Sequence, residues 1–101
     1  MKLNVKFMVI NEATQGVSRS TGLPWVCQSV VVAWDELRDE ATGEVVTQRL
    51  ACRLHGAEVE RLQRLCPVLG LTVVPVDIRF RTDTVNNRVI NDVRLWLADR
   101  Q

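Results

Sequence analysis

The residues of this 101-residue chain that could do chemistry are cations and tryptophans spaced two apart in strand-like segments. Side chains at that spacing share one face of a strand, where cations can hold phosphate groups and aromatic rings can stack on bases. All of the cations are predicted to point away from the core. The candidate cations are Lys2, Lys6, Arg49, Arg53, Arg79, Arg81, Arg88 and Arg94, and the candidate stacking residues are Trp25 and Trp96. These residue types are typical of a binder of single-stranded nucleic acid.

Each candidate also has a purely structural interpretation. Trp25 follows a proline, so it could cover one end of a barrel or lie in an interface, and Trp96 could simply pack. The strand arginines could instead pair with acids across strands. The acids considered for such pairs are Asp77, Asp92 and Glu44. The remaining aromatic residues, expected to be structural, are Phe7, Phe80 and Trp34. Few rings are therefore left for a strong binder.

Enzymatic and metal chemistry find little support in the sequence. The single histidine, His55, precedes Gly56 at an expected helix start and is interpreted as a capping or surface residue. The cysteines show no C-x-x-C pairing and are expected to be buried, reduced thiols; they are Cys27, Cys52 and Cys66. No nucleophile elbow or phosphate-binding glycine loop occurs. We therefore expect a protein that is not an enzyme, with no cofactor and no metal.

The charge is unevenly distributed although the formal net charge is only +1. Residues 35–44 hold five acids and one base, a local net of −4, and the rest of the chain holds twelve bases and seven acids, a net of +5. The acidic stretch is either a projection from a basic body or an ordinary solvated turn. The alternating N-terminus is unlike a signal peptide, no run is long enough for a membrane span, and the thiols suit a reducing cytoplasm.

The hydrophobic pattern predicts five strands and one helix. The longest strand-like run, residues 25–34, has a core face and a half-polar face. Its core face is Val26, Gln28, Val30, Val32 and Trp34, and its other face is Trp25, Cys27, Ser29, Val31 and Ala33. The other strands are residues 3–10, 45–54, 71–82 and 88–98, with a helix of about ten residues between 55 and 67. Loops are expected at 11–24, 35–44 and 82–87.

The inward residues of the other strands follow from the same alternation. The expected inward sets are Leu3, Val5, Phe7 and Val9; Leu50, Cys52 and Leu54; Val74, Val76, Ile78 and Phe80; and Val89, Val93, Leu95 and Leu97. Asn91 falls on an inward position and stays unassigned. The order of three strands, a helix and two strands predicts one mostly-β domain over residues 1–101. This order is that of the five-stranded oligonucleotide/oligosaccharide-binding (OB) barrel, which carries its helix between strands three and four.

Two stretches of the chain carry family resemblances. RDEATGE, an apolar strand, LHGAEVERLQRL and a strand ending RFRT together resemble bacterial single-stranded DNA-binding proteins. SRSTGLPWVCQSVV, with Gly22, Pro24, Trp25 and Gln28, and the last strand NDVRLWLAD resemble small, uncharacterised OB-fold domains common in Bacteroidetes. The resemblance covers roughly residues 18–99. It implies an OB-fold and, from the first family, binding of single-stranded DNA and assembly as dimers or tetramers.

The chain departs from the DNA-binding family at three places. Leu69-Gly70 stands where those proteins usually have Lys-Gly, and RTDTVNN replaces a basic-aromatic segment. The chain ends ADRQ, where they carry an acidic tail that recruits other proteins. The fold thus carries over better than the binding function does.

Two hypotheses from different classes follow. In the first, single-stranded DNA lies across strands two and three, between residues 11–24 and 82–87, with low sequence specificity. Trp25 would stack, and the phosphates would be held by Lys6, Arg49, Arg53, Arg79 and Arg81. In the second, the barrel is a protein-interaction or oligomerisation module without nucleic-acid binding. Its interface would contain Met8, Trp25, Val31 and Ala33.

Overall fold

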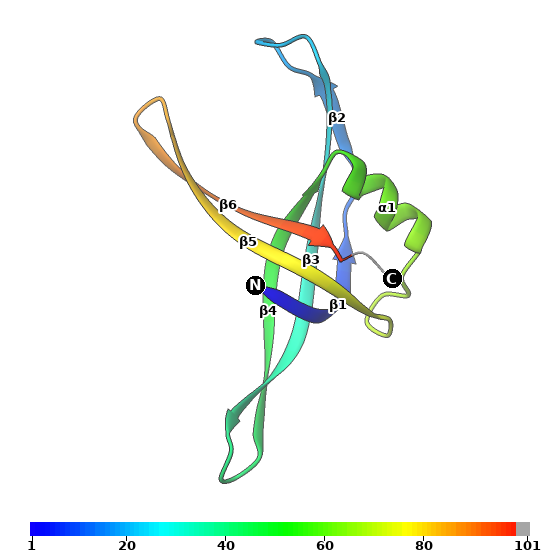
Figure 1. The fold of residues 1–101 in the computed structure, drawn as a ribbon, viewed down its shortest axis with the longest axis vertical. Coiled ribbons are helices and arrows are strands. Elements are labelled where there is room, and N and C mark those ends of the chain that lie inside the picture. Colours follow the sequence, from blue (N-terminus) through cyan, green and yellow to red (C-terminus); the bar gives the residue numbers. More distant parts are fainter. Residues whose placement is uncertain (99–101) are drawn as a thin grey trace.

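The computed structural model describes residues 1–98 and shows a closed five-stranded β-barrel with one extra strand and one helix (Figure 1). The elements are β1 (Lys2–Ile10), β2 (Thr14–Val17), β3 (Pro24–Asp39), β4 (Glu44–His55), α1 (Ala57–Leu65), β5 (Val73–Val85) and β6 (Arg88–Leu97). The sheet order is β1-β5-β6-β4-β3-β2, and a β1–β3 pairing closes the barrel. The mostly-β, OB-like barrel predicted from the sequence is therefore confirmed.

The strand pairings show how the barrel closes. β4 and β6 run parallel and meet at one residue pair, Arg53 with Arg94. The neighbouring pairings are antiparallel and longer; β5 and β6, for example, pair from Val76–Leu97 to Val85–Arg88. This β4–β6 pairing, which we call the β4–β6 seam, is thus the shortest in the barrel. The two residues that form it, Arg53 and Arg94, are both candidate cations.

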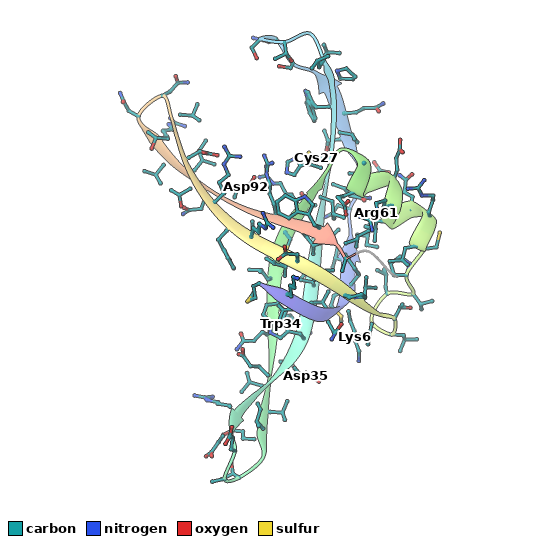
Figure 2. The ribbon with its side chains drawn as sticks, in the orientation of Figure 1. Lys6, Cys27, Trp34, Asp35, Arg61 and Asp92 are labelled. Carbon is teal, nitrogen blue, oxygen red and sulfur yellow. The ribbon has the colours of Figure 1, made fainter. Side chains whose placement is uncertain are left out.

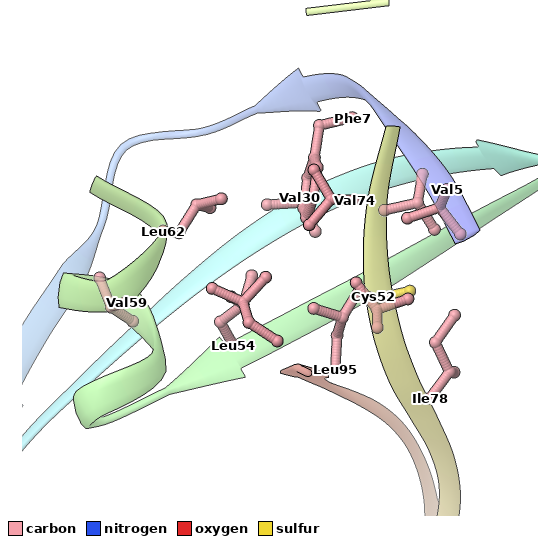
Figure 3. Packing of buried hydrophobic residues seen from close by; sticks show 13 residues of the cluster. Val5, Phe7, Val30, Cys52, Leu54, Val59, Leu62, Val74, Ile78 and Leu95 are labelled. Atoms are coloured by element: carbon pink, nitrogen blue, oxygen red, sulfur yellow. The ribbon is translucent and has the colours of Figure 1, made fainter. Parts of the chain in front are cut away.

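The core is formed by alternate residues of the five barrel strands, as the period-two pattern predicted. Figure 3 shows the side chains converging from β1, β3, β4, β5 and β6. The strand residues of this cluster are Val5, Phe7, Val30, Val32, Cys52, Leu54, Val74, Val76, Ile78, Leu95 and Leu97. Val59 and Leu62 of α1 close one end of the cluster. Gln28 is also buried, and its Nε2 donates to the Asn11 carbonyl at 2.8 Å.

The helix is attached to the end of β6 by polar contacts as well as by its apolar face. The Leu97 amide donates to Glu58 Oε2 at 2.7 Å, and Arg61 donates to the Leu97 carbonyl at 3.1 Å. The helix ends at Leu65, and the C-cap residue Cys66 adopts the left-handed conformation just before Pro67. The predicted helix is confirmed, but Cys66 is exposed rather than buried, because its position follows the last core-facing turn.

Three hairpin arms extend beyond the barrel, where the sequence predicted loops (Figure 1). Residues 11–24 contain β2, which pairs with β3 from Thr14–Cys27 to Val17–Pro24. Residues 35–39 continue β3, so only 40–43 form the turn before β4. β5 runs to Val85, and the β5–β6 turn is Asn86-Asn87, both with positive φ. Polar side chains that bond across the strands, such as Thr47 with Asp35, allow these polar stretches to form paired strands instead of loops.

The arms also explain why some residues with inward spacing are not buried. Phe80 and Val89 lie on the β5–β6 arm beyond the barrel interior and are 62% and 68% exposed. Asn91 lies on the same arm, where its Oδ1 accepts a hydrogen bond from Thr82 Oγ1 at 3.1 Å. Assigning Phe80 to the core was therefore wrong, because the alternation continues after the core has ended.

Candidate nucleic-acid interface

The exterior of β5 and β6 brings three arginines and a tryptophan together. Arg79 lies opposite Arg94, and Trp96 follows two residues along β6 on the same face. The Arg79 guanidinium carbon is 5.3 Å from the centroid of the Trp96 ring, a cation–π contact. A hollow of about 310 Å³ is lined by Arg79, Phe80, Arg81, Arg94 and Trp96. We call these five residues the β5–β6 patch.

Phe80 is the member of the patch that sequence analysis missed. Its side chain is 62% exposed and alternates with Arg79 and Arg81 along β5, so the ring points to the other face of the strand from their guanidinium groups, where it is open to a ligand. Strand length could have identified it, because Val74, Val76 and Ile78 already supply three inward layers of a small barrel. A fourth inward residue therefore falls beyond the core.

Arg53 of β4 continues the patch across the seam. It pairs with Arg94 in register, and within residues 1–98 it has no ion-pair partner. A second hollow, of about 240 Å³, lies where β6 diverges from β4, and it is lined by Ser29, Ala51, Cys52, Arg53, Asn91, Asp92 and Val93. Cys52 itself is buried, and this burial raises the pKa of its thiol to about 11.

Aspartates pair with the patch arginines along each strand rather than across strands. The contacts are Arg79–Asp77 at 3.3 Å, Arg81–Asp83 at 3.1 Å and Arg94–Asp92 at 3.1 Å. The predicted acids Asp77 and Asp92 do pair with arginines, whereas Glu44 lies at the far arm. The N-terminal ammonium also donates to Asp77 and, with Arg79, lowers the pKa of that carboxyl. The arginines of the first two pairs are exposed, so those pairs are weak and a phosphate can compete for their guanidinium groups, whereas the Arg94–Asp92 pair is partly buried.

His55 lies between Arg53, Arg94 and Asp92 at the end of β4. Its Nε2 is 4.0 Å from Asp92 Oδ2 and, although covered, has no hydrogen-bond partner among the described residues. Burial and then the charge of Arg94 lower the pKa of His55, while Asp92 opposes the shift. The ring is therefore neutral at neutral pH. Gly56, rather than His55, occupies the N-cap position of the helix, and no side chain caps it.

Trp25 belongs to a different arm. It is 43% exposed on β3 and lies against Gly16 of β2, where a Cβ would come within 2.7 Å of the indole Cζ2 atom. Glycine at position 16 thus leaves room for the ring. Figure 1 shows the β2–β3 arm, which carries Trp25, and the β5–β6 arm rising at the same end of the barrel.

The other predicted cations lie elsewhere. Lys6 and Arg49 both neighbour Ala33 on the β1–β3–β4 side of the barrel. Lys2 lies opposite Asp77 at the β1–β5 pairing, and Arg88 is next to the turn of the β5–β6 arm. The structure therefore divides the predicted set instead of gathering it into one site.

Comparison with protein-family models, with curated proteins and with solved structures gave no match in any of the three. The family resemblances of the sequence therefore stay predictions. The barrel topology rests on the structure alone.

Two further observations concern metal ligands and membrane spans. Residues 1–98 contain no group of three or more histidine, cysteine or acidic side chains placed to hold a metal ion. No helix in the same range is long and apolar enough to cross a membrane. The residues suggested for an interaction surface are mostly covered: Ala33 is buried, Met8 and Val31 are half-buried, and Trp25 alone is exposed.

Proposed function

We propose that the protein is a non-enzymatic binder of single-stranded DNA with low sequence specificity. The observation that carries the proposal is the β5–β6 patch, in which three arginines and the Trp96 ring gather at one exterior hollow of an OB-like barrel, with the exposed Phe80 on the same strand. Backbone phosphates and base faces are present in every sequence, so these groups would bind without reading bases.

The chemistry of each side chain determines its proposed role in binding DNA. Arg79, Arg81 and Arg94 would exchange their aspartate partners for phosphate oxygens, and Arg53 would add a cation that has no such partner in residues 1–98. Trp96 would stack on a base, a contact worth ~1–3 kcal/mol per base, and Phe80 would take a second base where the chain passes to the other face of the arm. Trp25, on the facing arm, would meet the chain as it leaves the patch.

The test is the affinity of a fluorescently labelled oligothymidylate, measured by anisotropy at low salt. The double variant Arg79→Gln/Arg81→Gln should bind at least about tenfold more weakly, because each charge-assisted hydrogen bond contributes ~1.5–3 kcal/mol. The control is Arg38→Gln/Arg64→Gln, which removes two cations far from the patch. Equal weakening in both variants would show only a general charge effect, and saturable binding that neither variant weakens would exclude the patch.

A second candidate is the oligomerisation module, alone or together with DNA binding. It is favoured by the outer edge of β2, which ends the sheet, and by exposed apolar residues on that arm, Val17 and Leu23. A free edge strand can pair with a second copy. Light scattering should then give a dimer or tetramer that Val17→Glu dissociates, whereas a strict monomer at high concentration would rule this module out.

The proposal also includes a cytoplasmic location. All three cysteines are free thiols, including the buried Cys52, as expected in a reducing compartment. Measurement of the thiol state in protein recovered from its native host tests this, since a disulfide there would contradict it.

A further inference from the structure

Lys6 and Arg49 lie on opposite sides of Ala33 on the barrel exterior. Ala33 is in register with Lys6 of β1 and with Arg49 of β4. Adjacent strands are about 4.8 Å apart, so the two cationic residues start about 10 Å from each other. Ala33 is small and buried, and it forms part of the floor of a hollow between them. Their long side chains can therefore converge on one ligand above Ala33.

A hollow of about 340 Å³ occupies this position. Its lining includes Asn4, Lys6, Ala33, Trp34, Asp35 and Arg49. Figure 2 shows Lys6, Trp34 and Asp35 in the lower half of the barrel, away from Asp92 at the β5–β6 patch. Along β4, Arg49 lies four residues from Arg53, a separation of about 13 Å. The hollow is thus a separate place from the proposed DNA-binding patch.

The charge balance of this hollow differs from that of the patch. Each of the three patch arginines has an aspartate partner, whereas Lys6 and Arg49 have no ion-pair partner within residues 1–98. Asp35 is the one acid of the lining, and its Oδ1 already accepts a hydrogen bond from Thr47 Oγ1 at 2.8 Å. Two neighbouring like charges repel, and an anion between them removes that repulsion.

We propose that this hollow binds the phosphate group of a nucleotide. Lys6 and Arg49 would bind the phosphate oxygens from two sides, and Met8 and Val73, which also line the hollow, would supply an apolar wall for the rest of the ligand. Asp35 keeps one carboxylate oxygen available to accept from a ligand hydroxyl or N–H group. The proposal does not depend on DNA binding at the β5–β6 patch.

The first experiment is a phosphorus NMR titration of the full chain with inorganic phosphate and with thymidine monophosphate, at constant ionic strength. Saturable binding is expected, and Lys6→Gln and Arg49→Gln should each weaken it by about tenfold, the usual effect of one charge-assisted hydrogen bond. Arg64→Gln, on the helix, is the matched control and should bind as the wild type does.

A gain-of-binding variant keeps the test independent of any loss of folding. Asp35→Asn removes the only negative charge of the lining and should bind phosphate severalfold more tightly. Non-saturable binding, or equal affinities in the wild type, Lys6→Gln and Arg49→Gln, would overturn the proposal. Weakening by Arg64→Gln to the same degree would overturn it as well.

A second experiment decides whether the phosphate belongs to a free nucleotide or to a nucleic-acid chain. If the ligand is a free nucleotide, Lys6→Gln weakens thymidine monophosphate binding but leaves oligothymidylate affinity unchanged. If it is a nucleic-acid chain that extends past the patch, Lys6→Gln also weakens binding of a long oligothymidylate but not of a short one. Arg79→Gln/Arg81→Gln should leave monophosphate binding intact, so the two proposed sites can fail separately.

Discussion

The exposed phenylalanine on the β5–β6 arm is the residue on which the proposed interface most depends. Phe80 leaves an apolar ring largely in water on the face of β5 opposite the guanidinium groups of Arg79 and Arg81, so it contributes little to the core. An exposed ring in such surroundings gains favourable contacts only when something covers it. Stacking of a base on Phe80 would provide that cover, and the adjacent guanidinium groups would hold the connecting phosphates.

Replacing this ring should therefore affect binding more than folding. Phe80→Ala is expected to weaken oligothymidylate binding by about tenfold, within the ~1–3 kcal/mol of one stacked base, and to change the melting temperature little. Val89→Ala, an equally exposed apolar position on the same arm, is the control and should leave the affinity unchanged. Unchanged affinity in Phe80→Ala, measured by anisotropy, would remove Phe80 from the interface.

His55 makes a prediction about pH. Burial and the charge of Arg94 lower its pKa, so the unfolded chain binds more protons than the folded protein below about pH 6.5. Stability should therefore fall as the pH drops through that region, and the effect should be largely absent in His55→Gln. Urea unfolding at about pH 7.5 and about pH 5.5 measures this. The pKa of Asp77 is lowered from its usual value, so this carboxyl titrates below the pH range being compared and does not contribute to the difference. An identical pH dependence of stability in the wild type and in His55→Gln would contradict the lowered pKa of His55.

At the level of the elements, the three arms serve different purposes. The β5–β6 arm carries the proposed interface and the β2–β3 arm carries Trp25, whereas the β3–β4 arm extends away from both (Figure 1). The β3–β4 arm also holds most of the acidic stretch, and its apolar residues Leu37 and Val45 are exposed. This arm therefore contributes little to the core or to the proposed interface.

The β3–β4 arm should accordingly be dispensable. Replacing residues 37–45 by Asn-Gly would close the hairpin on the Glu36–Val46 pair with a favoured two-residue turn. The shortened protein is expected to keep its melting temperature to within a few degrees. It should also bind oligothymidylate at least as well, because the deletion removes three acids and one base. Loss of cooperative unfolding, followed by circular dichroism, would show that the arm supports the barrel.

Strand positions and the helix could be predicted because burial imposes a period on the sequence. Val5 and Phe7, or Val59 and Leu62, alternate with polar neighbours at the spacing of a strand or a helix. The arms could not be predicted from that pattern, because their strands are held by cross-strand pairs such as Thr47 with Asp35 rather than by burial. The division of the cations between two faces follows from barrel closure, which a strand-by-strand pattern does not contain.

At the scale of the whole molecule, the barrel separates its charges. The four arginines of the proposed interface gather around the β4–β6 seam, and most of the acidic stretch lies on an arm that points away from them. A polyanion that approaches the cationic side would therefore be repelled mainly by the aspartates that pair with the arginines. This arrangement favours fast, salt-sensitive association over tight, sequence-specific binding.

The most direct test of single-stranded DNA binding at the β5–β6 patch is the salt dependence of oligothymidylate affinity. Four arginine–phosphate contacts predict a slope of about −3 in a plot of the logarithm of affinity against that of salt concentration, since each contact contributes about −0.7. Arg79→Gln/Arg81→Gln should reduce the slope by about 1.4. A flat salt response, an unchanged slope in the variant or no saturable binding at low salt would contradict this account.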